Sequence, residues 1–219
     1  MLAGKHVYLE KPLAHNIKET RHLVQLEKET GLSCQMGNQG HSGGGLLMLD
    51  SWIRSGQIGK VETVHAWANP RWSFPDRVPP HGPIPEGFNW DHWLGPAQER
   101  TFSRQYVDAW RGWFDFGVGT LGDWFCHNAD APYTALDLDC PRLVEVKSTG
   151  PSKLSFPESV ELTFTFPANN ERGEVKIHWY QGERYMLARP QELEAGKKFG
   201  NSGGGTLIYG SKATVLTGS

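Results

Sequence analysis

The 219-residue sequence predicts an α+β fold, in which a mainly antiparallel sheet carries helices on one face and follows a β-α-β unit. Two patterns predict this class. Residues 7–36 have the order strand, helix, strand, which is one slice of a doubly wound sheet. Residues 142–216 consist mainly of short strand-like segments, as is typical of an antiparallel sheet.

The β-α-β unit begins with Val7, Tyr8 and Leu9, whose side chains favour a buried strand. Pro12 has no amide hydrogen for a sheet ladder, so the strand should end there with Lys11 at its carboxyl end. Ligands of open α/β sheets bind at that end. On position alone, a solvated strand-end lysine is the commoner role for such a residue.

A helix follows, because Asn16 and Glu19 form a variant of the capping box and Gly31 is a typical stop signal. Residues 32–36 are then a short strand. Gly40 to Gly45 lack the spacing of a phosphate-binding loop, and we interpret them as a flexible link between two domains. The predicted domains are residues 1–42 and residues 43–219.

The second domain should begin with a helix, since Leu46, Leu49 and Ile53 recur at helical spacing. Residues 61–68 alternate as a strand. Residues 70–89 contain six prolines, and Trp72, Phe74 and Phe88 favour an ordered loop over a site, with disorder as the alternative. Five further strands are predicted at residues 142–149, 159–166, 174–180, 206–209 and 214–216, with a connection at Asn169-Asn170.

Asp123 and His127 are four residues apart and share one face if residues 118–138 are helical. Pro132 should either break this segment or open a second helix capped by Asp130. An Asp-x-x-x-His pair can be an acid/base dyad, half of a metal site, or an intrahelical hydrogen bond. Spacing alone leaves all three alternatives open.

In combination, these elements resemble the Gfo/Idh/MocA family of sugar and polyol oxidoreductases. The matching elements are Glu10-Lys11-Pro12, the Gly-x-x-x-Asp-x-x-x-His pattern at Gly119, Asp123 and His127, the acidic position at Asp130, the turn at 56–59 and the segment at 90–96. They occur in the family's order as far as about residue 130. Beyond residue 140 the resemblance is carried by the strand pattern.

The resemblance implies catalytic roles for Lys11, Asp123 and His127. His127 would accept the proton of a substrate hydroxyl, because imidazole titrates near neutral pH. Asp123 would orient that ring or hold a neighbouring hydroxyl, and Lys11 would stabilise the developing alkoxide. The cofactor would be NAD or NADP, with Glu10, Lys11, Pro12, Asn38 and Gln39 near it. The Lys-Pro peptide bond of this family is often cis.

Two departures from the family pattern concern the same site. Many relatives have an arginine near the position of His41, so the sequence does not identify the residue that anchors the substrate. A glycosidase branch of the superfamily has a tyrosine at the position of Trp124, and its absence here favours a dehydrogenase.

Composition and charge exclude some classes of partner. The formal net charge of -2 gives no basic excess for a nucleic-acid partner, and no apolar run reaches the length of a membrane span. Cys34, Cys126 and Cys140 show no metal or disulfide spacing, so we predict reduced thiols and no metal. We expect a small sugar or polyol-like substrate and a homo-oligomer formed through the sheet. Cytoplasmic and periplasmic locations are both consistent with the sequence.

The resemblance also indicates which part of a typical family member this sequence covers. Family members begin with a dinucleotide-binding domain whose first strand-to-helix turn carries a glycine fingerprint, and this sequence has no such turn. We therefore interpret residues 1–42 as the end of that domain and residues 43–219 as a substrate-binding and oligomerisation domain truncated at its C-terminus. The alternative function is a catalytically incompetent assembly module. We expect these 219 residues alone to bind NADH weakly or not at all.

Overall fold

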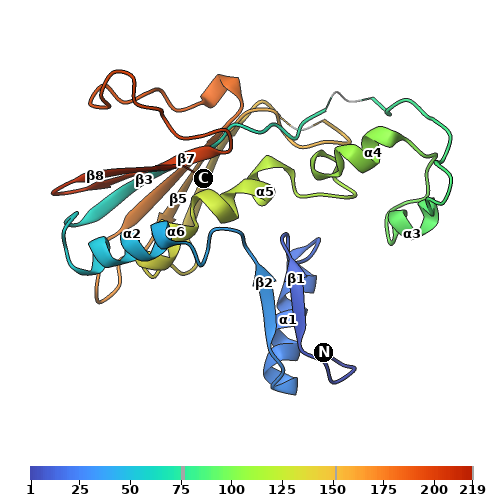
Figure 1. The fold of residues 1–219 in the computed structure, drawn as a ribbon, viewed down its shortest axis with the longest axis horizontal. Helices are drawn as coiled ribbons and strands as arrows, with labels where there is room; N and C mark the ends of the chain where they lie inside the picture. Colours follow the sequence, from blue (N-terminus) through green and yellow to red (C-terminus); the bar gives the residue numbers. More distant parts are fainter. Residues whose placement is uncertain (75–76, 151, 219) are drawn as a thin grey trace.

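A computed structural model describes residues 1–74, 77–150 and 152–218. Its first part is the predicted β-α-β unit, made of β1 (Val7–Glu10), α1 (Ile17–Thr30) and β2 (Cys34–Gly37). The two strands pair in parallel, and the unit extends away from the rest of the chain (Figure 1). The side chain of Asn16 accepts a hydrogen bond from the Glu19 amide, and Gly31 ends the helix with φ of 66°. Both capping predictions are confirmed.

The second part is a six-stranded sheet with the strand order β4-β5-β6-β3-β7-β8. Its strands are β3 (Val61–Ala68), β4 (Leu143–Ser148), β5 (Val160–Phe166), β6 (Val175–Gln181), β7 (Gly204–Gly210) and β8 (Thr214–Gly218). Within this sheet, as far as the structure describes it, four of the pairings are antiparallel and only that of β3 with β6 is parallel. The α+β class with a mainly antiparallel sheet is confirmed, with this one parallel pair as a refinement.

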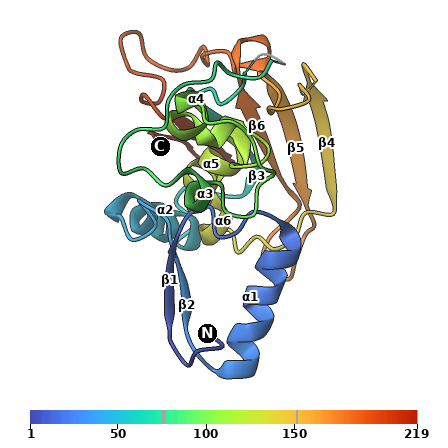
Figure 2. The same cartoon turned by 90° about the vertical axis from the view of Figure 1, so that its right-hand side faces the viewer.

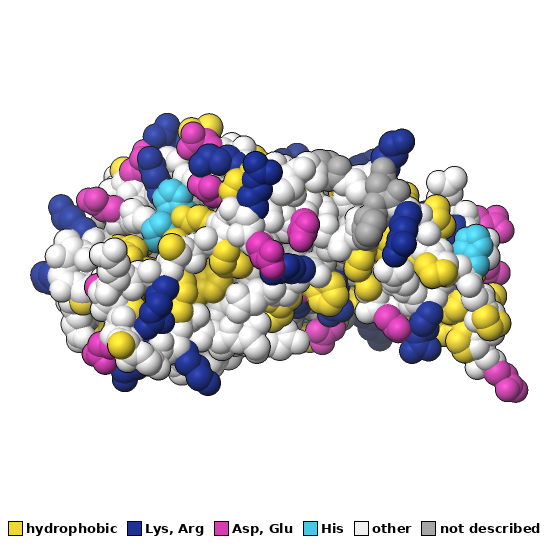
Figure 3. All heavy atoms as spheres, turned by 90° about the horizontal axis from the view of Figure 1, so that it is seen from above, with side chains coloured by type: hydrophobic (Ala, Val, Ile, Leu, Met, Phe, Trp, Pro, Cys, Tyr) yellow, Lys and Arg dark blue, Asp and Glu magenta, His cyan; other side chains and the backbone are white. Residues whose placement is uncertain are grey.

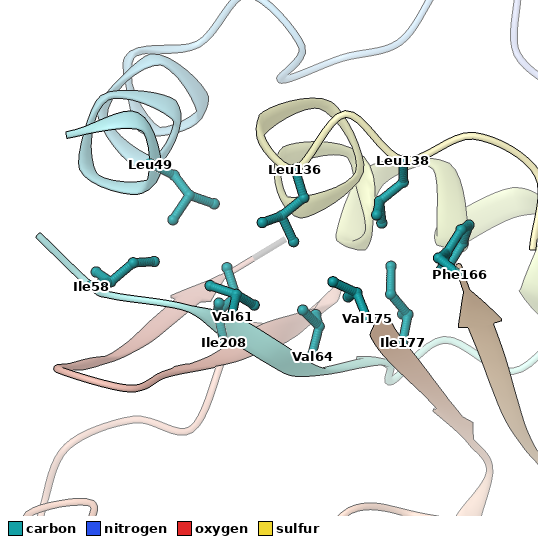
Figure 4. Close-up of a cluster of buried hydrophobic side chains, with 10 residues drawn as sticks. All are labelled: Leu49, Ile58, Val61, Val64, Leu136, Leu138, Phe166, Val175, Ile177 and Ile208. Atoms are coloured by element: carbon teal, nitrogen blue, oxygen red, sulfur yellow. The ribbon is translucent and has the colours of Figure 1, made fainter. Parts of the chain in front are cut away.

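Helices α2 (Gly44–Arg54), α5 (Gly119–Asn128) and α6 (Asp130–Ala135) cover one face of this sheet (Figure 1). Figure 4 shows side chains from the helical layer pointing onto those of the strands. The cluster comprises Leu49, Ile58, Val61, Val64, Leu136, Leu138, Phe166, Val175, Ile177 and Ile208. A buried aliphatic side chain contributes about 1.5–3 kcal/mol. Phe125 of α5 packs against this cluster, so the core holds α5, and the residues that it carries, over the sheet.

The long connection before α5 packs an aromatic cluster of its own. It contains α3 (Trp90–Leu94), α4 (Arg104–Asp108) and the 3-10 turn η1 (Trp110–Gly112), and η1 contacts α5. Figure 2 views the molecule from the side on which α3 and α4 lie. The buried side chains are Trp90, Leu94, Phe102, Tyr106 and Trp113. Phe74 stacks on Trp113 with ring centroids 4.6 Å apart. The predicted ordered loop is thus anchored at this point, whereas residues 75 and 76 lie outside the described residues.

One predicted cap is wrong. The helical segment does divide near Pro132, but the residue before α6 is Ala129, and Asp130 is the first helical residue. The Asp130 carboxylate instead contacts the side chains of Asn38 and His41. Tertiary partners have therefore taken the oxygens that would otherwise cap the helix. A second 3-10 turn, η2 (Glu183–Tyr185), follows β6.

A Gly-x-Gly-x-x-Gly spacing does occur, at Gly117, Gly119 and Gly122, but its context is not that of a nucleotide loop. The segment follows η1 rather than a strand. A Cβ atom at Gly117 would lie 2.4 Å from the Arg111 carbonyl oxygen, and one at Gly119 would lie 2.6 Å from the Phe156 ring. These two glycines permit close packing at the start of α5.

Charges of both signs are scattered over the surface seen in Figure 3, with hydrophobic groups between them. The described residues include no helix that is both long and apolar enough to cross a bilayer. Within the same residues, no group of three or more His, Cys, Asp and Glu side chains could hold a metal ion.

Candidate active site

The strand-end lysine reaches the helical aspartate directly. Lys11 follows β1, and its Nζ donates hydrogen bonds to Asp123 Oδ1 at 2.7 Å and to the Asp123 backbone oxygen at 2.9 Å. The Lys11-Pro12 peptide bond is cis. The Lys11 side chain is 12% exposed and that of Asp123 is 4% exposed. The two residues therefore form a buried ion pair.

Two further donors complete the surroundings of the Asp123 carboxylate. Arg111 Nε donates to Asp123 Oδ1 at 3.1 Å, and Trp72 Nε1 donates to Asp123 Oδ2 at 2.9 Å. The Trp72 amide is also fixed, by Thr120 Oγ1 on α5. Sequence reasoning noted Trp72 only as a loop aromatic and missed Arg111 altogether. Arg111 lies in η1 and belongs to no recognisable spacing, so no local signal marks it.

His127 lies one turn after Asp123 on α5, but the carboxylate does not orient its ring. His127 Nδ1 lies 3.3 Å from the backbone oxygen of Gln39, in the segment that follows β2. Of the two roles expected for Asp123, orienting this ring is not seen among the described residues, where its oxygens accept from Lys11, Arg111 and Trp72 instead. Holding a substrate hydroxyl stays a prediction. A hydrogen bond to a carbonyl oxygen requires the proton on Nδ1, which leaves Nε2 of the neutral ring free to accept a proton.

The surroundings favour the neutral form of this imidazole. Burial lowers the pKa of His127 below its ordinary value of 6.5, and the positive charge of Lys11 lowers the pKa further. At neutral pH the unprotonated form of the ring therefore predominates. This is the state in which a histidine acts as a general base.

Lys11, Asp123 and His127 line one cavity of about 750 Å³. Gln39, Trp72, Arg111, Trp124 and Asn128 are also in its wall. The volume lies in the range of small-molecule sites. Among buried polar atoms, Asn128 Oδ1 and Trp124 Nε1 have no hydrogen-bond partner within the described residues. The wall thus combines two cations, two carboxylates, a histidine and aromatic surfaces.

The remaining predicted site residues are distributed around this cavity. Glu10 and Pro12 line a second cavity of about 540 Å³, and Lys11 lines both. Asn38 does not line the cavity of His127. Its Nδ2 donates to the Cys126 backbone oxygen at 2.7 Å and to Asp130 Oδ2 at 3.1 Å. It lines a third cavity together with Cys126 and Asp130. The structure therefore brings Gln39 to the catalytic candidates and gives Asn38 contacts that support α5 and α6.

Comparison with protein-family models matches residues 48–160 to the C-terminal alpha/beta domain of an oxidoreductase family, the Gfo/Idh/MocA type. The chain belongs to the Gfo/Idh/MocA oxidoreductase family. The match covers the segment from α2 to the start of β5 and includes both Asp123 and His127. Comparison with curated protein sequences gives no match.

Solved structures share the fold. The WlbA dehydrogenase from Bordetella pertussis, in complex with NADH and UDP-GlcNAcA, is 20% identical with a TM-score of 0.61, and 98% of this chain matches 49% of that one. A putative myo-inositol dehydrogenase from Sinorhizobium meliloti is 15% identical with a TM-score of 0.57, and 100% of this chain matches 51% of that one. This chain therefore spans about half the length of the structures that it resembles.

The same fold also occurs in a super-repressor mutant of Gal80p from Saccharomyces cerevisiae. That protein is 16% identical with a TM-score of 0.59, and 97% of this chain matches 48% of it. A Gfo/Idh/MocA fold is thus found both in dehydrogenases and in a repressor. Function must therefore be argued from the site.

Proposed function

We propose that the full-length protein is an NAD(P)-dependent oxidoreductase that transfers a hydride between a nicotinamide cofactor and a hydroxyl-bearing carbon of a sugar or polyol-like substrate. The observation that carries this proposal is the convergence of Lys11, Asp123 and His127 on one cavity. Residue 11 and residue 123 are distant in sequence, yet their side chains are in contact there. Convergence of a cation and a neutral imidazole suits the oxidation of an alcohol.

Each of the three residues has a distinct part in this reaction. His127 Nε2 accepts the hydroxyl proton while the adjacent carbon gives up its hydride. The Lys11 ammonium stabilises the negative charge that develops on the substrate oxygen. Asp123 is a positioning residue, because it fixes Lys11, Arg111 and Trp72 through three hydrogen bonds.

A bound nicotinamide would supply the hydride acceptor. The cavity shared by Glu10, Lys11 and Pro12 suits such a ring, since Trp93 and Trp110 form an apolar wall beside the strand end. Lys11 lies between this cavity and that of His127, where a cation would be close to both reactants. NAD and NADP are both consistent with these residues.

The proposal is tested by steady-state kinetics of the full-length protein with NAD and NADP against a panel of sugars, sugar acids and inositols. His127→Ala should lower kcat by about 10²–10⁴-fold with little change in nicotinamide affinity, as expected for loss of a general base. His92→Ala, which removes an exposed imidazole from α3, is the matched control. Unchanged turnover in His127→Ala would leave His127 with a structural role only.

An assembly module is the second candidate. Edge strand β4 exposes Leu143, Val144 and Val146 by 47%, 44% and 62%, and such apolar edges commonly become covered by a partner. A homo-oligomer through the sheet would cover them. Light scattering measures the oligomeric state and so tests the assembly module. Val146→Lys should shift a dimer towards monomer. An oligomer without any turnover on the substrate panel would favour the assembly module over the enzyme.

A further inference from the structure

The Arg111 guanidinium forms a hydrogen bond through Nε but none through its two terminal nitrogens within the described residues. Its Nε donates to Asp123, whereas no hydrogen bond from its Nη1 or Nη2 is found in the described part of the chain. The guanidinium carbon lies 4.5 Å from the centroid of the Trp110 ring and 5.6 Å from that of the Trp72 ring. Aromatic contacts and the Nε bond thus restrict the plane of a group whose two terminal nitrogens are available.

The charge at this point is unbalanced. Lys11 and Arg111 share the single carboxylate of Asp123, which leaves one positive charge in excess. The other acidic residue of the cavity wall, Asp130, contacts His41 and Asn38 instead. Lys11 is 12% exposed and Arg111 is 34% exposed, so the excess charge is accessible mainly through Arg111. A partly buried guanidinium that shares its carboxylate with a second cation favours binding of a further anion.

Unpartnered polar atoms in the same wall also indicate a ligand. Asn128 is 3% exposed, and its Oδ1 accepts no hydrogen bond within the described residues. The Nε1 of Trp124 is likewise buried and has no partner in the part of the chain that the structure describes. A buried polar atom without a partner is costly, so a ligand that carries hydroxyl groups would offset that cost.

We propose that Arg111 binds a carboxylate or phosphate group of the substrate, so that this site accepts acidic sugars in preference to neutral ones. The planar pair of terminal nitrogens matches two oxygens of such a group. Arg111 lines the cavity of His127 and not the second cavity beside Glu10 and Pro12. The anion therefore belongs to the molecule whose hydroxyl reaches His127, rather than to the cofactor. This inference rests on the proposed function.

Binding can be measured without any turnover, because Trp72 and Trp110 flank Arg111 and report through their fluorescence. The full-length protein would be titrated with D-glucuronate, D-glucose 6-phosphate and D-glucose. We expect at least one acidic sugar to bind about tenfold more tightly than glucose, as is usual for a charge-assisted pair. Preference for glucuronate or for the phosphate ester identifies the group that is recognised.

Three variants make the result specific. Arg111→Gln should weaken binding of the preferred acidic sugar by about tenfold and change glucose binding less than twofold, and Arg111→Lys should lie between. Arg104→Gln is the control, since Arg104 is 71% exposed and pairs with Asp108 on the surface. Circular dichroism would show whether each variant is folded. If Arg111→Gln does not fold, the comparison with the parent is made with Arg111→Lys.

Several outcomes would overturn the inference. These are equal affinity for glucose and both acidic sugars, equal loss for acidic and neutral sugars in Arg111→Gln, or no binding of either acidic sugar at about 10 mM, a concentration well above usual KM values. Failure of the proposed function looks different. Arg111-dependent binding without hydride transfer would reject the oxidoreductase and leave the anion site in place.

Discussion

Lys11 and Asp123 are 112 residues apart in the sequence, and their side chains form an ion pair of 2.7 Å. The pair joins the carboxyl end of β1 to the middle of α5. It therefore links the β-α-β unit to the sheet domain at the point where the candidate active site is assembled. Asp123 accepts from Arg111 and Trp72 as well, so the carboxylate is the common anchor of this wall.

Asp123→Asn should destabilise the protein by about 3–5 kcal/mol, the usual cost when one partner of a buried ion pair is removed. Lys11→Met should cost less, because Arg111 and Trp72 still hold the carboxylate. The double variant should be destabilised by less than the sum of the two single variants, since the interaction between the two side chains can be lost only once. Urea unfolding of the four proteins measures this cycle. The exposed pair Arg54–Asp50 is the control and should show coupling below about 1 kcal/mol. Strict additivity at Lys11 and Asp123 would contradict the ion pair.

The pH dependence of turnover should follow His127. Its pKa is lowered below 6.5 by burial and by Lys11, so the ring loses its basic form only when the pH falls through that lowered value. We expect kcat/KM to be constant near pH 7 and to fall on the acid side at a pH below 6.5.

Removal of the lysine charge provides a separate check on the same group. Lys11→Met should raise the pKa of His127, because the repulsion by the ammonium is gone while the burial remains. An NMR titration of the imidazole measures this shift without any need for turnover. An unchanged or lowered His127 pKa in Lys11→Met would show that the two groups are not electrostatically coupled.

Stability should also depend on pH through His65. Burial and the nearby His178 lower the pKa of His65 from 6.5 to about 4. The unfolded chain therefore binds a proton that the folded chain excludes between pH 6.5 and about 4, so stability is full above pH 6.5 and decreases as the pH falls to about 4. His178, whose pKa is also lowered by burial, acts in the same direction.

The His65 contribution can be separated by substitution. His65→Asn should flatten the decrease in the urea midpoint between pH 7 and pH 4, because the titrating group is absent. His92→Asn should leave the decrease as it is in the parent, since His92 is exposed on α3. An identical pH profile for His65→Asn and the parent would exclude His65 as a source of acid sensitivity.

The core beneath α2 and α6 should be sensitive to loss of volume. Ile177 is 0% exposed in β6, and Ile177→Ala should cost about 2–5 kcal/mol through lost burial and the cavity left behind. Val146→Ala in β4 is the contrasting change, because Val146 is 62% exposed and its loss should cost less than about 0.5 kcal/mol. Similar unfolding midpoints for the two variants would show that Ile177 is not part of a close-packed core.

Sequence alone determined the features that depend on a few neighbouring residues. The capping pattern at Asn16 and Glu19 predicts the start of α1, and Gly31 predicts its end. The alternation in residues 61–68 predicts β3 with its observed bounds. These features follow from backbone hydrogen bonding and side-chain periodicity, which act within one or two turns of chain. The motifs at Lys11 and at Asp123 with His127 were also recognisable, because their spacing is local.

Only the tertiary structure decided which groups these residues contact. Gln39 rather than Asp123 orients His127, and Arg111 joins the site without any local signal. The parallel pairing of β3 with β6 and the change of Asp130 from a cap to a partner of His41 were likewise not predictable. Each depends on segments brought together by burial of the core, and their contacts are chosen by packing and charge between distant parts of the chain rather than by the residues beside them in sequence.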